Sequence, residues 1–540
     1  MAFSSTMKPT DSFECEHVEM LVPEKRCLRR VCDDISLDIF LVAVVELAER
    51  FTYRSITAPM QNYIQHGRGD VLHHGALGLG QKVATGISYF FVGWCYLAPI
   101  FGAVVADSYL GRFKTIFLGT GLSVCGVLVL LLTSLPPSLE HGGGLPGLML
   151  ALILIGLGCG GIKSNVGPLI AEQYSMRTER VKTLPSGEMV IVDPNITVQT
   201  VYARYYWVIN IGALSIIPAS WLELKVDFWA AFMMPLCLWL LAIVALVAGR
   251  KKYVVQQPHG SAVTKAIRVL WISLKNNGNM DAARPFAMEA TGTPVCWDNT
   301  FVDELKRALV ACRVFLLYPI FWLCNGQANN NLVSQASSLK TYGMPHDMMG
   351  LFNPLAILIA VPLFERLINP ALRRFDIPFK PISRMTTGFV AIAFAIAIAA
   401  IIQQLIYQSP PSRVSILLQI PVYALIGLSE FFASLSGMEY AYTKAPRSMR
   451  SIVSALFLLT CTIGSTVGVT LSPVSVDPKV LVEYAFLSIT MFATAVVFYF
   501  CFRRYNQMEE SMNMIGETSK EGSRKSSVED IHDLCRLEKQ

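Results

Sequence analysis

Long apolar runs separated by short polar segments repeat along almost the whole chain. Each run has roughly 20 residues, which is enough for a helix to cross the hydrocarbon core of a bilayer. The runs predict twelve membrane-spanning helices, divided six and six by a polar segment between residues 250 and 307. Their expected bounds are residues 37–60, 83–106, 113–134, 146–171, 203–222 and 228–249, then 308–331, 346–368, 384–407, 414–437, 451–472 and 480–502.

This pattern predicts an all-α membrane protein made of two six-helix bundles. We expect a cytoplasmic N-terminal tail (1–36), a first bundle (37–249), a cytoplasmic loop between the bundles (250–307), a second bundle (308–503) and a disordered cytoplasmic tail (504–540). Two repeated halves are a common plan among secondary transporters, whose substrate site lies near mid-membrane between the halves.

Composition and charge agree with a multi-pass membrane protein. Only 16% of the residues are charged and 53% are hydrophobic, whereas soluble chains have about 25% charged residues. Lys and Arg cluster in alternate connections, so the positive-inside rule places both termini in the cytoplasm, with the plasma membrane as the expected compartment. The net charge of +6 reflects this bias and does not indicate a nucleic-acid partner.

Motifs for enzymatic chemistry are missing from the sequence. The 13 cysteines form no CxxC pair and no cluster with metal-ligand spacing. There is no phosphate-binding loop, Ser/His/Asp arrangement or dinucleotide fingerprint. The sequence therefore predicts neither an enzyme nor a protein with a metal or cofactor.

The first apolar run carries charges that share one face of its helix. At helical spacing, Glu46, Glu49, Arg50 and Tyr53 fall within about a third of the circumference. A charge at mid-bilayer costs on the order of 2.5 to 3.5 kcal/mol, and such groups mark substrate or proton paths. The alternative is an interfacial ion pair whose long side chains reach outward to water.

Lys163 ends a glycine-rich stretch of the fourth run. Because small residues let helices approach closely, we expect Lys163 to reach the carboxylates of the first run. Glu46, Glu49, Arg50 and Lys163 would then form a nearly neutral set, in which protonating one glutamate frees a cation. Alternatively, Lys163 extends to the cytoplasmic interface.

The second half offers its own polar candidates. Glu430 lies near the middle of the tenth run with Ser429 as its immediate polar neighbour, which suits a second proton-sensitive site. In the seventh run, Trp322, Asn325 and Asn329 repeat at helical spacing and could present an aromatic wall and amides to a peptide backbone. An amide network between helices is the alternative.

The connection between the second and third runs contains a glycine-flanked acid followed by basic residues. Asp107, Gly111 and Arg112 belong to a Gly-xxxx-Asp-xxx-Gly-Arg-x-Lys pattern, residues 102–114. The pattern resembles the cytoplasmic gate motif of the major facilitator superfamily.

Several ordered motifs together resemble the proton-dependent oligopeptide transporter family, in particular its fungal peptide-transporter branch. They are Glu46-Leu-Ala-Glu-Arg-Phe-Thr-Tyr53, Gly158-Cys-Gly-Gly-Ile-Lys163, Tyr205-Tyr-Trp-Val-Ile-Asn-Ile-Gly212, residues 327–335, Asn353-Pro354 and residues 430–446. The resemblance implies the major facilitator fold, with proton-coupled import of di- and tripeptides by alternating access.

The resemblance also implies roles for the candidate residues. Arg50 and Lys163 would hold the peptide carboxylate, Glu430 would face its amino end, and Glu46 or Glu49 would take the proton. Tyr53, Trp322 and Asn325 would shape the pocket.

Arg54 and Ser55 stand where the family usually has Tyr and Gly. Ordinary dipeptide selectivity is therefore open. A carrier of a secondary metabolite or modified peptide remains an alternative, as does a nutrient sensor that does not transport.

Overall fold

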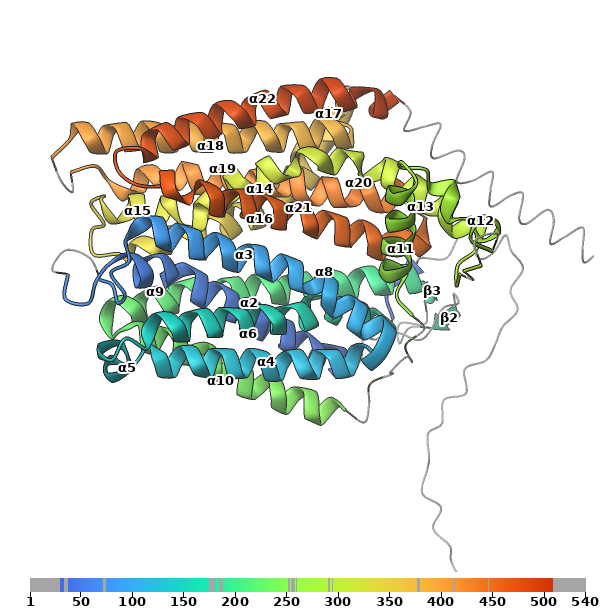
Figure 1. Cartoon of the computed structure of the whole chain (residues 1–540), viewed down its shortest axis with the longest axis horizontal. Coiled ribbons are helices and arrows are strands. Elements are labelled where there is room, and N and C mark those ends of the chain that lie inside the picture. Colours follow the sequence, from blue (N-terminus) through green and yellow to red (C-terminus); the bar gives the residue numbers. More distant parts are fainter. Residues whose placement is uncertain are drawn as a thin grey trace, which may run out of the picture.

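The computed structural model describes residues 30–33, 37–70, 74–173, 180–183, 188–250, 253, 258, 260–289, 292–293, 295–375, 379–410, 413–444 and 446–507. Two sets of roughly parallel helices lie side by side (Figure 1). The first bundle is made of α2 (Leu37–Gln65), α3 (Gly80–Val105), α4 (Arg112–Thr133), α6 (Gly144–Lys163), α7 (Val166–Glu172), α8 (Pro194–Ala213), α9 (Ile216–Lys225) and α10 (Phe228–Gly249), with the short α5 (Pro136–Glu140) in a connection.

The second bundle begins with a long interrupted helix. Its elements are α13 (Asn299–Ala311), α14 (Tyr318–Gly326), α15 (Asn331–Ser337), α16 (Phe352–Leu363), α17 (Asn369–Arg374), α18 (Pro381–Gln408), α19 (Ile420–Glu430), α20 (Ser436–Lys444), α21 (Arg450–Leu471) and α22 (Val480–Gln507). In the described part of the chain, three short π-helical segments interrupt these bundles, at Ala106–Leu110, Phe364–Ile368 and Phe431–Leu435.

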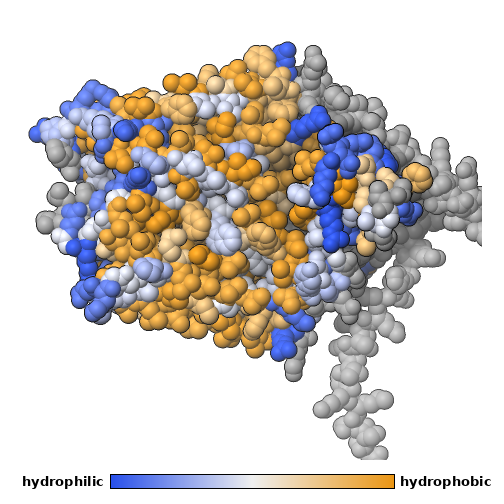
Figure 2. Space-filling view, viewed as in Figure 1, coloured by the Kyte–Doolittle hydropathy of each residue, from blue (hydrophilic) through white to orange (hydrophobic). Residues whose placement is uncertain are grey.

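The described helices confirm the expected membrane architecture. Eleven of them are long and apolar enough to span a bilayer. The 29-residue α2 is not among these eleven, because several charged side chains interrupt its apolar sequence; we expect it to be the twelfth span. An apolar belt covers the visible face between two polar ends (Figure 2), as expected for a surface in contact with lipid tails.

Some predicted spans are broken or shifted. The fifth run is two helices, α8 and α9, with a break at Leu214 and Ser215. The seventh is divided by 3-10 segments at Cys312–Leu317 and Gln327–Asn329. Pro319 lies in the first turn of α14 and explains why a new helix begins there, because proline lacks the N–H that a continuous helix needs.

The segment between the bundles is more structured than the predicted loop. It contains α11 (Ala262–Lys275), the 3-10 segment η2 (Met280–Ala283), α12 (Pro285–Glu289) and the start of α13. On the same side of the molecule, β1 (Arg30–Val31), β3 (Met189–Val192) and β2 (Arg180–Thr183) form a small sheet in the order β1-β3-β2. We call this side the linker end, and the opposite side, where α2 ends and α3 begins, the far end.

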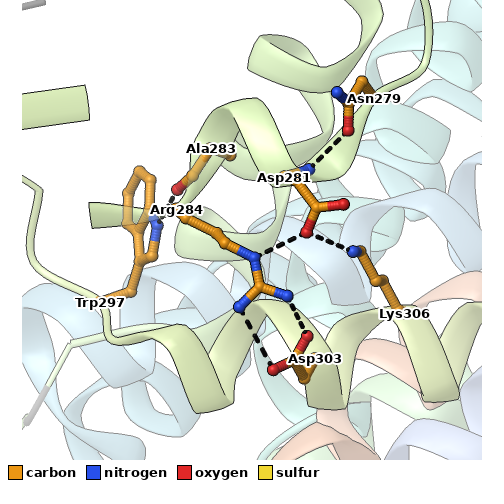
Figure 3. A network of polar contacts seen from close by, with 7 residues as sticks. All are labelled: Asn279, Asp281, Ala283, Arg284, Trp297, Asp303 and Lys306. Carbon is orange, nitrogen blue, oxygen red and sulfur yellow. Dashed lines mark hydrogen bonds and ion pairs between the residues drawn. The ribbon is translucent and has the colours of Figure 1, made fainter. Parts of the chain in front are cut away.

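A charged network attaches η2 to α13 (Figure 3). Asp281 Oδ1 accepts hydrogen bonds from Arg284 Nε and Lys306 Nζ, both at 2.6 Å, and Arg284 Nη2 donates to Asp303 Oδ1 at 2.7 Å. Hydrogen bonds from Lys306 and Arg284 lower the pKa of Asp281. Trp297 Nε1 donates to the carbonyl of Ala283 at 2.8 Å, which closes the segment into a folded unit.

Candidate substrate and proton site

Three charged side chains of α2 meet inside the first bundle. Arg50 Nε lies 3.3 Å from Glu46 Oε1 and 3.3 Å from Glu49 Oε2. The two glutamate side chains are 1% and 3% exposed, and that of Arg50 is 23% exposed. The structure therefore brings these charges together as the helical spacing predicts, and one guanidinium serves both carboxylates.

Residues outside the predicted set complete this cluster. Cys159 Sγ on α6 donates to Glu49 Oε1 at 2.8 Å, and the side chain of Tyr205 on α8 interacts electrostatically with Glu46. A Cβ on Gly212 would lie 2.9 Å from Arg50 Cβ, so this glycine lets α8 approach α2. Cys159 and Tyr205 belong to motifs that the sequence analysis singled out, although it assigned them no role.

Lys163 does not form the expected ion pair with the first-helix carboxylates. Its Nζ is buried and has no hydrogen-bond partner among the described residues. The ammonium lies 4.3 Å from the centroid of the Tyr96 ring and 5.6 Å from that of Tyr53, within the range of cation–π attraction. The prediction was wrong because Arg50 occupies both carboxylates and aromatic faces receive the lysine.

Glycines on α3 and α6 explain where Lys163 lies. A Cβ on Gly160 would be 2.6 Å from the backbone of Ala98, and one on Gly102 would be 2.1 Å from the Gly160 carbonyl oxygen. No larger residue fits these positions, so α6 packs directly against α3. Close packing of these helices places Lys163 beside Tyr96 of α3.

Aromatic side chains connect this cluster to the second bundle. The Tyr96 and Trp322 rings have centroids 6.0 Å apart. Trp322 Nε1 donates to Thr460 Oγ1 at 3.2 Å. Tyr53 is 8% exposed and stacks with Phe91 at 5.9 Å, so it belongs to the wall of the first bundle.

Glu430 is held by two amides of the second bundle. Its Oε1 accepts from Asn325 Nδ2 at 2.7 Å and from Asn353 Nδ2 at 3.1 Å. Glu430 is the last residue of α19, directly before the π-helical segment Phe431–Leu435; π segments often occur at functional sites. A Cβ on Gly427 would lie 2.4 Å from the Asn353 carbonyl oxygen, so α16 and α19 approach closely there. Asn353 was missed as a partner, although its Asn-Pro pair was noted.

Asn329 does not continue the helical face of Trp322 and Asn325. The helix ends at Gly326, and the following 3-10 turn places Asn329 in a small cavity that Arg54 and Asp347 also line. Asn325 therefore belongs with Glu430, whereas Asn329 lies with Arg54.

The expected gate motif lies at the linker end. Gly111 has φ +76°, which suits glycine, and Arg112 forms an ion pair with Glu172, a partner that was not predicted. The carbonyl oxygen of Asp107 accepts from the backbone N–H of Gly260 at 2.9 Å. The linker between the bundles thus contacts the gate motif directly.

The bundles are joined by polar contacts at the far end. Gln61 Nε2 of α2 lies 3.1 Å from Ser334 Oγ of α15, and Thr85 Oγ1 of α3 donates to Asn331 Oδ1 at 3.0 Å. The far end is therefore closed in this structure.

Among the described residues, no group of three or more His, Cys, Asp or Glu side chains could hold a metal ion.

A model of the POT family (PTR2) matches residues 113–487. The chain belongs to the POT family. The peptide transporter PTR2 of Saccharomyces cerevisiae is 42% identical over 502 residues, 91% of this chain and 83% of that protein. The peptide transporter PTR_B of Candidozyma auris is 44% identical over 506 residues, 91% and 86% of the two chains. This POT protein is therefore a transporter and not an enzyme.

A solved structure confirms the fold of this POT protein. The POT family transporter PepTSo superposes with a TM-score of 0.69 at 20% identity, covering 88% of this chain and 99% of that one. The predicted family and all-α major facilitator fold are thus confirmed.

Proposed function

We propose that this POT protein is a proton-coupled symporter that imports di- and tripeptides by alternating access. The single observation that carries this proposal is Lys163, whose buried ammonium makes no hydrogen bond with the described residues. Tyr96 interacts electrostatically with Lys163 from the first bundle and with Glu430 from the second. A peptide has a carboxylate at one end and an ammonium at the other, which matches a cation on one bundle and an acid on the other.

The charge balance of the α2 cluster supports coupling to protons. Glu46 and Glu49 together offset the positive charges of Arg50 and Lys163. A proton on one glutamate weakens its pairing with Arg50 and leaves a net positive site, which attracts the peptide carboxylate. The proton and the peptide then favour the same state, as alternating access requires of both ligands.

The relatives support peptides as the substrate class, since the two fungal proteins above are named peptide transporters. Arg54 favours a second candidate, a carrier of a modified peptide or secondary metabolite, because its side chain lines a cavity shared with Asp347. An MFS-type transporter, ucsM of an Acremonium species, is 33% identical over 519 residues, 90% of this chain and 87% of that protein. The proposal includes residence in the plasma membrane with both termini in the cytoplasm; the distribution of Lys and Arg supports the orientation of the termini.

Uptake by reconstituted protein tests the proposal. Proteoliposomes with an inward proton gradient should accumulate a labelled dipeptide, and collapsing the gradient should abolish the accumulation. A tripeptide should compete, whereas a free amino acid should not. Displacement of the label by a bulky metabolite but not by the tripeptide would favour the second candidate. No gradient-dependent uptake of any of these compounds would contradict transport.

A further inference from the structure

A second pair of buried acids lies at the far end, away from the site described above. Glu223 is in the last turn of α9, and Asp347 is near the start of η5 (His346–Leu351). The two residues are 3% and 2% exposed. Their carboxyl groups interact electrostatically and lie close enough to share a hydrogen bond, and Ser220 of α9 also donates to Asp347. Because α9 belongs to the first bundle and η5 to the second, this acid pair spans the interface between the bundles.

One buried carboxyl oxygen of the acid pair has no hydrogen-bond donor among the described residues. Asn62 Nδ2 donates to Glu223 Oε1 at 3.0 Å, and Ser220 Oγ donates to Asp347 Oδ2 at 2.6 Å. Glu223 Oε2 is buried and has no donor in the described part of the chain. An ionised carboxylate only accepts hydrogen bonds. A hydrogen bond between two carboxyl groups therefore needs a proton on one of them.

The surroundings supply no ion pair that would replace this proton. Within the described ranges, neither carboxyl lies within ion-pair distance of a Lys, Arg or His nitrogen. Arg54 lines a cavity with Asp347, and Tyr423 interacts electrostatically with Asp347. Two further titratable residues are close in the sequence: His346 precedes Asp347, and Lys225 follows Glu223 by two positions on α9. Two bare carboxylates in contact would repel strongly away from water.

We propose that Glu223 and Asp347 together bind one proton when the bundles meet at the far end, and that this proton holds the far end closed. Opening separates α9 from η5 and exposes both carboxyls to water, where each ionises. Closing then takes up a proton from the far side. This proton site is separate from Glu46 and Glu49, and it operates without a peptide.

Distances across the far end test the proposal. Spin labels at His141 in the first bundle and Val476 in the second, both in far-end connections, report the closed fraction as pH rises. The closed-to-open ratio of the labelled protein should fall by up to about tenfold per pH unit where the proton is lost. Glu223→Gln or Asp347→Asn supplies an amide that donates a hydrogen bond without binding a titratable proton. Either variant should therefore stay closed at high pH, and the pH dependence of its closed-to-open ratio should correspond to about one proton fewer than in the wild type.

Two controls separate this proton from general packing. Ser220→Ala removes a donor to Asp347 but no proton, and His346→Gln removes the adjacent titratable group. Both should keep the wild-type slope. Infrared spectra should contain a band of a protonated carboxylic acid that both amide variants lack.

An unchanged slope in both amide variants, loss of the slope in Ser220→Ala, or an infrared band that survives both substitutions would overturn the proposal. Because no peptide is present, these results do not depend on the proposed function.

Discussion

Replacing Lys163 by glutamine tests whether its unpaired ammonium holds the substrate carboxylate. The Nζ is buried and makes no hydrogen bond with the described residues, so removing the charge loses cation–π contacts with Tyr96 and Tyr53 but no hydrogen bond to them. A hydrogen bond between charged groups contributes about 1.5 to 3 kcal/mol. Its loss should weaken binding of a dipeptide by roughly ten- to a hundredfold.

The dipeptide amide provides the internal comparison. It has the same side chains and amino group but no C-terminal charge, so Lys163→Gln should change its affinity by much less. Competition with a labelled dipeptide in wild-type and variant proteoliposomes gives the inhibition constants of both ligands. The comparison is between the loss of affinity for the dipeptide and the loss for its amide. Lys163→Arg should retain part of the selectivity for the carboxylate, because it keeps the cation.

The matched control is Lys82→Gln, which removes an exposed lysine from α3 of the same bundle. It should leave both inhibition constants unchanged. Equal losses for the dipeptide and its amide in Lys163→Gln would refute the reasoning, since a lysine that only supports packing against Tyr96 would affect both ligands alike.

Three further predictions follow from other charged groups. Glu46→Gln and Glu49→Gln should abolish gradient-driven accumulation but leave counterflow exchange, because an amide keeps the shape and cannot titrate; normal accumulation by both variants would contradict the proton role. Arg54→Tyr with Ser55→Gly should broaden uptake of neutral dipeptides, and superimposable uptake profiles would show that Arg54 does not select the substrate. The contacts of Asp281 lower its pKa, so they stabilise the linker above about pH 4, and this stabilisation is lost as pH falls through the lowered pKa. Asp281→Asn should therefore raise protease cleavage of the linker at pH 7, and the difference from wild type should vanish in acid.

The membrane architecture could be predicted because each span carries its own signal. About 20 consecutive apolar residues identify a helix without knowledge of its neighbours, and the charges of α2 identify one face by spacing alone. The interruptions at Leu214 and at Gln327–Asn329 could not be predicted in this way. They occur within apolar or amide-rich sequence, where tertiary packing decides whether the helix continues.

Partners across helices were the least predictable part of the site. Opposite charges suggested a bond between Lys163 and the first-helix glutamates, yet Arg50 lies one helical turn from Glu46 and takes that place. Glu430 has as partners the neutral amides of Asn325 and Asn353, which charge alone does not identify. The charges in the sequence show which buried side chains need a partner. Which partner they reach depends on how closely the helices approach each other at glycines.

The occupancy of Arg50 has a mechanistic consequence that charge counting alone does not provide. If Lys163 had paired with the glutamates, a peptide carboxylate would have to break an ion pair to bind. In this structure Lys163 rests on the face of Tyr96, and a cation–π contact of about 0.5 to 2 kcal/mol is weaker than the charge-assisted bond that replaces it. Binding to Lys163 therefore needs no proton, whereas recruiting Arg50 needs a glutamate to be neutralised. We therefore propose that proton coupling in this arrangement depends on Arg50, and that Lys163 determines how tightly the carboxylate is held.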